Sequence, residues 1–286
     1  MNQQKRSLQF IFSLIVIAII VLSVGLFSNS QATGNLKVYF LDVGQGDAGY
    51  IKTPSGEDIL IDGGPNNSVL DGLGKVMDFG DREINLVILT HPHADHINGL
   101  VEVLKRYKVD EVWETGVEYP SGSYSTWQNE ILDKKISDKI VKVGDEKSFG
   151  DVKIKILYPL SPIENKNLDN LNNASIVNRL EYKEFSVLFT GDAEKEIQQK
   201  ILDQNIFSTI LKVAHHGSNN GLTEDFLKVV QPAVAVISVG KDNTYGHPTS
   251  SVINILNQYG VRIYRTDQNG TIEISSDGKG YSIKNY

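Results

Sequence analysis

The stretch Thr90–His96 (THPHADH) constrains this chain more than any other, because it places three histidines and an aspartate directly after the apolar run 86–89. The run predicts a buried strand, which would deliver these side chains to one rim of a sheet. Imidazole and carboxylate groups are common ligands of divalent metals. The alternative is a solvent-exposed loop that merely contains histidines, but the whole chain has 6 histidines and half of them fall here. The stretch therefore predicts a metal site.

Composition limits how such a metal is held and what the protein binds. The chain has 286 residues, no cysteine and a formal net charge of -7. Without cysteine there is neither a disulfide framework nor a thiolate zinc site, so His, Asp or Glu side chains must hold any metal. The acidic balance argues against non-specific coating of nucleic acid or anionic lipid, which needs a basic surface. It leaves a phosphodiester substrate open, because bound divalent metals supply local positive charge.

The first 34 residues have the pattern of a membrane segment, because Lys5 and Arg6 precede an apolar run over residues 8–27. About 20 apolar residues suffice to span a bilayer core of roughly 30 Å. Two alternatives stay open: a signal peptide cleaved near the small-residue site 30–32, and a single anchor that remains in the cytoplasmic membrane. The charges predict a cytoplasmic N-terminus, so both alternatives place the rest of the chain outside the cytoplasm.

The body of the chain, residues 35–286, reads as two halves of similar order. In the first half we expect a loop over 121–127, helices at 69–79, 97–107 and 129–139, and strands at 36–43, 48–53, 58–62, 84–89, 109–113 and 140–143. In the second half we expect helices at 193–202, 223–230 and 250–259, and strands at 152–157, 175–182, 185–190, 209–214, 233–239, 261–265 and, as the last strand, 270–275. This order predicts an α/β (α+β) fold in which two mixed sheets face each other with helices outside, a four-layer αββα sandwich.

The other histidines and one aspartate also follow predicted strands. Asp192 comes after 185–190, His215 and His216 come after 209–214, and His247 lies in the loop after 233–239. Chance placement would put some histidines on helices. We therefore expect these side chains to converge with the stretch Thr90–His96 into one site.

The number of donors suits two metal ions. His91 and His93, two residues apart, can face one ion, and Asp95 and His96 can face a second, while the carboxylate of Asp192 can bridge the two. A water between two cations loses its proton readily and becomes a hydroxide nucleophile near neutral pH. The pattern therefore predicts metal-assisted hydrolysis.

At the level of motifs, the sequence His-x-His-x-Asp-His in Thr90–His96 resembles the metallo-β-lactamase fold superfamily. The resemblance is closer to one branch, the hydrolase domain of the competence-channel family (the ComEC/Rec2 type), and the catalytic domain of pneumococcal phosphorylcholine esterase is similar too. Five ordered motifs carry it: LDVGQGDA (41–48), IDGG (61–64), FTGD (189–192), LKVAHHGS (211–218) and YGHP (245–248). It covers about residues 36–276 and implies the metallo-β-lactamase fold. The sequence has one apolar segment, so only the hydrolase module of the channel proteins carries over.

The resemblance also implies roles for individual residues. It implies two divalent metal ions, Zn²⁺ first and Mn²⁺ as the alternative, with the ligands His91, His93, Asp95, His96, Asp192 and His216. It implies His215 as a phosphate contact or proton donor, although the sequence alone does not choose between the adjacent His215 and His216. His247 is a further ligand, a substrate-contacting acid or an ordinary loop histidine. Asp95, His215 and His247 form the predicted catalytic set.

This chain departs from the superfamily pattern at one metal position. It has no histidine between residues 100 and 190, where many members place a third ligand to the first metal. Asn173 or Ser175 is expected near that place. We therefore expect one metal to be weakly held or partly occupied.

The predicted function is an extracytoplasmic metal-dependent hydrolase, a phosphoesterase or phosphodiesterase. Its substrate would be DNA or a cell-wall polymer such as a decorated teichoic acid. The cytoplasmic membrane is a partner if the N-terminal segment is uncleaved, and no protein partner is predicted. Two alternatives are a non-catalytic metal-binding surface module and a hydrolase of a non-phosphate ester or a lactam.

Smaller features have two interpretations each. Asp42, Asp47 and Asp62 sit where strands give way to turns, and we favour turn carboxylates bonded to backbone amides over direct metal ligation. A functional role for them would be to hold a ligand imidazole by its other nitrogen. Tyr124 and Trp127 would form either a substrate lid or ordinary loop contacts.

Overall fold

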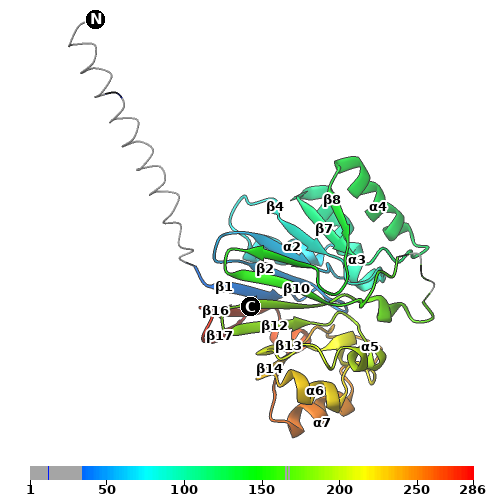
Figure 1. The fold of residues 1–286 in the computed structure, drawn as a ribbon, viewed down its shortest axis with the longest axis vertical. Coiled ribbons are helices and arrows are strands. Elements are labelled where there is room, and N and C mark those ends of the chain that lie inside the picture. The colour runs from blue at the N-terminus through cyan, green and yellow to red at the C-terminus, as the bar shows by residue number, and fades with distance from the viewer. Residues whose placement is uncertain (1–11, 13–33, 165, 167) are drawn as a thin grey trace, which may run out of the picture. The chain divides into compact units, whose positions relative to one another are not determined.

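Strand pairing arranges the body of the chain into two facing sheets (Figure 1). The computed structural model describes residue 12, residues 34–164, residue 166 and residues 168–286. Within these residues the first sheet has eight strands in the order β17 (Tyr281–Asn285), β16 (Ile272–Ser276), β1 (Leu36–Phe40), β2 (Gly49–Lys52), β3 (Asp58–Ile61), β5 (Leu86–Ile88), β7 (Glu111–Glu114) and β8 (Ser137–Ile140). The second has seven, in the order β15 (Arg262–Arg265), β14 (Val234–Ile237), β13 (Ile210–Lys212), β12 (Phe185–Phe189), β11 (Val177–Tyr182), β10 (Val152–Tyr158) and β9 (Glu146–Phe149).

Helices cover the outer face of each sheet (Figure 1). The first sheet packs against α2 (Ser68–Val76), α3 (Ala94–Arg106) and α4 (Gly122–Lys134), and the second against α5 (Lys195–Lys200), α6 (Glu224–Val230) and α7 (Ser250–Gln258). Shorter elements are the strand pair β4 (Glu83–Ile84) and β6 (Lys108–Val109), the helix α8 (Thr266–Asn269), and the 3₁₀ turns η1 (Leu171–Ala174) and η2 (Ala214–Gly217). The predicted four-layer αββα sandwich is confirmed.

Period-two alternation along the strands separates the three apolar layers. In β3, Ile59 and Ile61 pack between the sheets, whereas Leu60 packs against the helices. In β13, Ile210 packs between the sheets and Leu211 packs against α5, α6 and α7. Both sheets also contain a parallel part, β3–β5–β7–β8 and β12–β13–β14–β15. The carboxyl ends of parallel strands share one edge, and ligands bind outside that edge in α/β sheets.

The predicted loop over 121–127 is wrong, because these residues begin α4. The hydroxyl oxygen of Ser121 accepts a hydrogen bond from the amide of Tyr124 and so caps the helix. The buried indole of Trp127 donates to Glu114 at 2.9 Å and anchors the helix on the first sheet, which excludes a lid role for Trp127. The helix ends at Lys134, because Lys135 adopts a left-handed conformation. The helix predicted at 129–139 therefore extended too far. The strand predicted at 140–143 begins earlier, as β8 at Ser137–Ile140.

Glu114 is a buried carboxyl group whose titration should show in stability. Burial raises its pKa to about 7, and the negative charge of Asp138 adds to the effect. The folded state therefore keeps a proton on Glu114 that the unfolded chain releases near pH 4.5. We expect the free energy of unfolding to fall by up to about 3 kcal/mol as the pH rises from about 5 to about 8.

The control for this pH dependence is Glu114→Gln, which keeps the shape and removes the titration. Urea unfolding of both proteins at the two pH values should show that the fall in stability is smaller in the variant. An identical pH slope in both proteins would contradict the assignment.

Two strands were not predicted. β17 follows β16 through a Gly-containing turn and pairs with it in an antiparallel hairpin, so 270–275 is not the last strand. β9 adds to the far edge of the second sheet beside β10. Both are short edge strands whose side chains are largely exposed, so the apolar pattern that marks a buried strand is weak in them.

No helix among the described residues combines the length and apolar character needed to cross a bilayer. The predicted signal peptide or anchor falls on residues 1–11 and 13–33, which lie outside the described part of the chain.

Candidate metal centre

The stretch Thr90–His96 lies where β5 gives way to α3. His93 is the N-cap residue of α3, and Asp95 and His96 occupy its first turn. His91 and His96 are fully buried. The helix is held against the loop after β3 by two backbone hydrogen bonds, from Gly63 N to His96 O at 2.8 Å and from Gly99 N to Gly64 O at 3.0 Å.

Four donors from three separate segments form the densest cluster. Ligand atoms of Asp95, His96, Asp192 and His216 all lie within 4.8 Å of one another. His216 Nε2 lies 3.1 Å from Asp95 Oδ2 and 3.7 Å from Asp192 Oδ2. His96 Nε2 lies 3.3 Å from the same oxygen of Asp192. This donor set of two imidazoles and two carboxylates could hold one divalent ion.

A second group shares the carboxylate of Asp192. His91 Nε2 lies 2.9 Å from His93 Nδ1 and 3.9 Å from Asp192 Oδ2. His93 is partly exposed, so this group opens to the surface. The structure therefore brings together all six residues predicted as metal ligands, with Asp192 between the two groups.

The electrostatics of the cluster fit a cation. His96 Nε2 and Asp192 Oδ1 are buried and have no hydrogen-bond partner among the described residues. Burial alone would lower the pKa of His96, but the carboxylates of Asp192, Asp62 and Asp95 outweigh it and raise the pKa. Burial is likewise outweighed at His216, where Asp192 and Asp47 raise the pKa to about 10. A bound divalent ion would supply the positive charge that these carboxylates otherwise draw from protons.

Three of the four donor imidazoles have a partner on the nitrogen that faces away from the other donors. His96 Nδ1 lies 2.9 Å from Asp62 Oδ2, and His216 Nδ1 donates to the Ser238 carbonyl at 2.9 Å. The hydroxyl of Ser175 lies 3.2 Å from His91 Nδ1 and accepts from the amide of Asp192 at 3.0 Å. Such partners fix which nitrogen faces the metal.

These contacts decide between the interpretations of the turn carboxylates. Asp62 accepts from the backbone amide of Thr90, as the favoured interpretation expects, and also from the Thr90 hydroxyl. It contacts His96 Nδ1 as well, so it has the functional role too. Asp42 accepts from Gly44 N within its own turn, as expected. Of the two residues expected near the absent third ligand, Ser175 contacts His91, whereas the side-chain oxygen of Asn173 is buried without a partner.

A strained backbone conformation points the side chains of the adjacent histidines in different directions. His215 and His216 both have left-handed conformations, with φ of 47° and 51°. Such a conformation costs a non-glycine residue about 1–3 kcal/mol and is typical of functional sites. It turns His216 toward the metal donors and His215 away from them, so that His215 Nδ1 lies 2.9 Å from Glu194 Oε1.

Glu194 is a buried carboxylate that sequence reasoning missed. Its oxygens accept from the side-chain amides of Asn170 at 2.8 Å and Asn172 at 3.2 Å, in addition to contacting His215. With Nδ1–H directed at Glu194, the Nε2 atom of His215 has only a long contact, to Asn172 Nδ2 at 3.5 Å, among the described residues, and a substrate could replace it. The available signal was the position of Glu194 two residues after Asp192.

The ring of His247 lies 5.8 Å from that of His215, between His215 and the exposed Tyr245, on which it stacks. Burial lowers the pKa of His247, and the neighbouring His215 and His216 lower it further. His247 does not belong to the metal-donor clusters found among the described residues. Its position fits a substrate contact at the rim better than a ligand.

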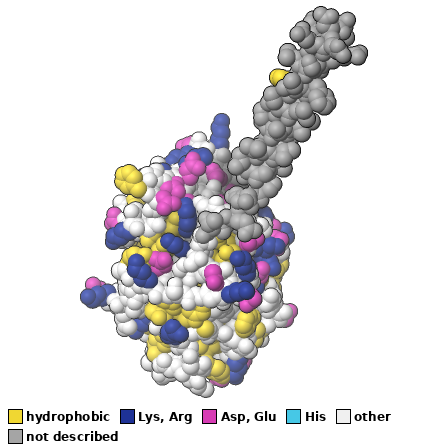
Figure 2. Space-filling view, turned by 90° about the vertical axis from the view of Figure 1, so that its left-hand side faces the viewer, with side chains coloured by type: hydrophobic (Ala, Val, Ile, Leu, Met, Phe, Trp, Pro, Cys, Tyr) yellow, Lys and Arg dark blue, Asp and Glu magenta, His cyan; other side chains and the backbone are white. Residues whose placement is uncertain are grey.

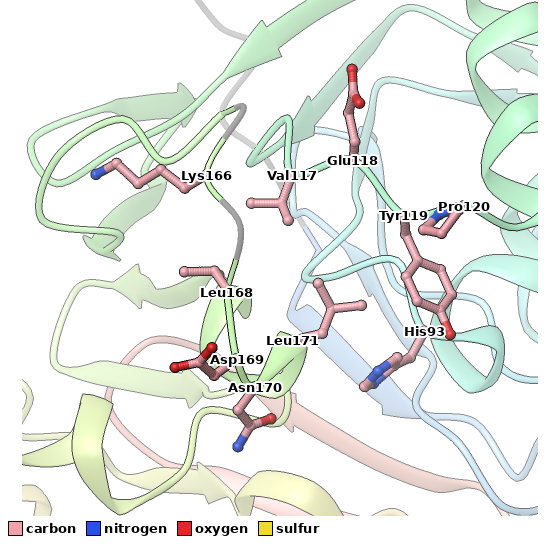
Figure 3. Close-up of a pocket in the computed structure, with 10 residues that line it drawn as sticks. All are labelled: His93, Val117, Glu118, Tyr119, Pro120, Lys166, Leu168, Asp169, Asn170 and Leu171. Atoms are coloured by element: carbon pink, nitrogen blue, oxygen red, sulfur yellow. The ribbon is translucent and has the colours of Figure 1, made fainter.

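A cavity of about 750 Å³ adjoins His93. Figure 3 shows Tyr119 beside His93, with Leu168 and Leu171 among the other lining side chains. The rings of Tyr119 and His93 meet edge to face with 5.8 Å between centroids. Lys166 is the single basic residue among the described lining residues, which also include Glu118 and Asp169. Of the six donor residues, His93 is the one that lines this cavity, so the cavity borders the more open of the two donor groups.

The chain is similar to proteins of one family over most of its body. Residues 41–241 match the family model described as Metallo-beta-lactamase superfamily. ComE operon protein 3 of Bacillus subtilis is 33% identical over an alignment of 261 residues, which covers 83% of this chain and 32% of that protein. Exodeoxyribonuclease YycJ of Bacillus anthracis is 26% identical over an alignment of 102 residues, which covers 34% of this chain and 35% of that protein.

A solved structure supports the fold independently. The metallo-beta-lactamase fold protein YhfI from Bacillus subtilis covers 84% of this chain and 100% of its own, with a TM-score of 0.57 and 12% identity. This chain spans about a third of the length of the two sequence relatives. The resemblance predicted from the motifs is confirmed.

Proposed function

The chain belongs to the metallo-β-lactamase superfamily, and from this premise we propose that it is a metal-dependent phosphodiesterase that acts outside the cytoplasm. One observation carries the proposal: Asp192 lies within 4 Å of donors from both groups, with His91 Nε2 at 3.9 Å and His96 Nε2 at 3.3 Å. A carboxylate shared in this way suits a pair of divalent ions. All six donors are present, which argues against a non-catalytic surface module.

The choice of a phosphodiester rests on similarity and on charge. The name of YycJ describes a deoxyribonuclease, and the shared region includes a third of this chain. Figure 2 shows one face of the molecule, on which basic and acidic side chains are interspersed. A protein that tracks along nucleic acid needs a continuous basic footprint. The formal net charge of -7 argues against such a footprint, so we propose a substrate recognised locally, at one phosphodiester and its neighbouring groups.

The residues divide the chemistry among themselves. His91, His93 and Asp192 would hold one cation, and Asp95, His96, His216 and Asp192 the other. When bound, the cations supply Lewis-acid polarisation of the phosphoryl oxygens and favour deprotonation of the attacking water. His215 Nε2 donates a proton to the oxygen of the leaving group, while Glu194 holds the opposite nitrogen of the ring. His247 contacts the substrate beside His215.

The direct test is a substrate screen with purified residues 35–286 and with the full chain. Each is loaded separately with Zn²⁺ and Mn²⁺ and offered bis-p-nitrophenyl phosphate, single-stranded DNA, a phosphorylcholine ester, a carboxylic ester and a lactam. We expect metal-dependent cleavage of at least one phosphodiester and none after chelation. Cleavage of a carboxylic ester or lactam alone would overturn the proposal.

The proton-donor role of His215 predicts a dependence on the leaving group. The p-nitrophenolate group leaves without a proton, whereas an alkoxide such as a sugar hydroxyl needs one. We expect His215→Ala to slow cleavage of an alkyl phosphodiester by about 10²–10⁴-fold and to change p-nitrophenyl ester cleavage far less. Glu194→Gln should show the same preference with a smaller loss. Equal losses on both kinds of substrate would contradict the role.

Location can be tested separately from activity. Lys5 and Arg6 ahead of the apolar run 8–27 support a body on the outer side of the cytoplasmic membrane. In spheroplasts that express the full chain, added protease should digest the body while a cytoplasmic marker survives. Protection of the body equal to that of the marker would refute this location.

A further inference from the structure

Lys212 is the one lysine or arginine buried among the described residues, with 3% of its surface exposed. It is the last residue of β13 and follows the period-two alternation that places Ile210 between the two sheets. An apolar residue is the ordinary occupant of such a position. A buried ammonium group there needs charged or polar partners, and its partners here lie beside the metal donors.

The ammonium group joins three parts of the centre. It forms an ion pair with the buried carboxylate of Asp47, donates to the Gly191 carbonyl at 2.9 Å, and lies 3.9 Å from Asp192 Oδ1. Asp47 belongs to the loop after β1, and its Oδ1 atom lies 3.4 Å from His216 Nδ1. Lys212 thus contacts Gly191, the residue before Asp192. Through Asp47 it is also linked to the Nδ1 side of the His216 ring, opposite the nitrogen that faces the other donors.

The backbone at Gly191 shows why this contact matters. Gly191 is left-handed, with φ of 48°, and a Cβ atom there would meet Thr90 and Ser175 at 3.0 Å. The turn directs the carboxylate of Asp192 toward both donor groups. The hydrogen bond from Lys212 ties the Gly191 carbonyl in place, opposite the bond from Asp192 N to Ser175 Oγ at 3.0 Å.

We propose that Lys212 is a positioning residue for the metal centre, an internal cation that fixes where Asp192 and His216 stand relative to each other. The proposal rests on the two-metal site proposed above. A purely stabilising ion pair is the competing explanation. Replacing a buried ion pair by apolar residues is often neutral or stabilising, so stability alone does not account for a lysine here.

The test separates metal affinity from stability. Lys212→Met alone would leave Asp47 buried and unpaired, so the informative comparison is Asp47→Asn against Asp47→Asn/Lys212→Met. Lys155→Met is the matched control, because Lys155 is half-exposed and pairs with Glu181 at 2.9 Å on the solvent face of β10. Calorimetric titration with Zn²⁺ gives the affinity and stoichiometry, and thermal unfolding in chelator gives the stability of the metal-free protein.

We expect two Zn²⁺ ions per chain in the unmodified protein and in Lys155→Met. Adding Lys212→Met to Asp47→Asn should weaken at least one of the two binding steps by about tenfold or more, the usual effect of losing a partner behind a ligand. Unfolding in chelator should change little between these two variants. If the double variant fails to fold, Asp47→Asn/Lys212→Gln replaces it, because glutamine keeps a donor near Gly191.

The outcomes are distinguishable. Equal Zn²⁺ affinities, within twofold, in Asp47→Asn and the double variant overturn the positioning role and leave the proposed function intact. A parallel loss of metal-free stability and affinity on adding Lys212→Met indicates that Lys212 only stabilises the fold, and this result also overturns the positioning role. Fewer than two ions in the unmodified protein refute the two-metal site, and this inference with it.

Discussion

Replacing Asp192 with asparagine is expected to lower metal-dependent hydrolysis by more than about a hundredfold. Loss of a partner behind a ligand costs about 10–100-fold, and Asp192 is itself the shared ligand. Its Oδ2 atom is the common neighbour of His91, His96 and His216, at 3.9, 3.3 and 3.7 Å. An asparagine keeps the volume but removes the charge and one of the two oxygens. Both donor groups would therefore bind their metal ion more weakly.

The measurement pairs activity with metal content. Asp192→Asn should retain fewer Zn²⁺ ions per chain after gel filtration, with a circular dichroism spectrum like that of the unmodified protein. Asp225→Asn is the control, because Asp225 lies on α6 with its side chain 74% exposed. If Asp192→Asn keeps hydrolysis within a few-fold of the unmodified protein, the assignment of Asp192 as the shared ligand fails.

Replacing Gly99 with alanine is expected to destabilise the fold by about 3 kcal/mol or more, because overpacking displaces backbone here. A Cβ atom at this position of α3 would stand 1.8 Å from the Gly63 carbonyl oxygen and 2.8 Å from that of Asn66. The helix would have to move away from the loop that follows β3. Since Asp62 in that loop holds His96, metal affinity should also fall by about 10–100-fold.

Gly74→Ala is the matched control for Gly99→Ala. Gly74 also lies within a helix, α2, but a Cβ atom there meets nothing within 4 Å. Alanine should stabilise this helix by up to about 1 kcal/mol. Urea unfolding and Zn²⁺ titration of both variants test the pair. Similar behaviour of the two variants would show that the approach of α3 to the Gly63 loop does not position His96.

The layers and the metal donors could be predicted because strong local patterns mark them. The run 86–89 is apolar throughout, as a strand buried on both faces must be, and the donors follow such strands directly. The parallel pairing of β3 with β5 and of β12 with β13 brings these strand ends to one edge of each sheet. At these positions the local sequence pattern agrees with the strand topology, so the sequence alone was enough to predict the layers and the donors.

The partners behind the donors could not be predicted, because they come from distant segments. Nothing local distinguishes Asp62, which holds an imidazole, from Asp42, which bonds to its own turn. Lys212 reaches Asp47 across 165 residues of sequence, and Ser175 reaches His91 across 84. Pairs so far apart depend on how the two sheets face each other. The start of α4 was missed for a different reason, because serine and tyrosine at 121–125 resemble a loop until the buried Trp127 is known to anchor them.

The metal donors come from two halves of the chain. Those on α3 belong to the first half, and those after β12 and β13 belong to the second. Asp95 and His216, one from each half, are 121 residues apart. Ions held between them would act as a cross-link that this cysteine-free chain otherwise lacks. An ion that binds only the folded state raises the apparent stability of that state in proportion to the logarithm of the free ion concentration. The melting temperature of this protein should therefore report the free zinc concentration around it, and metal scarcity should expose it to proteolysis as well as silence it.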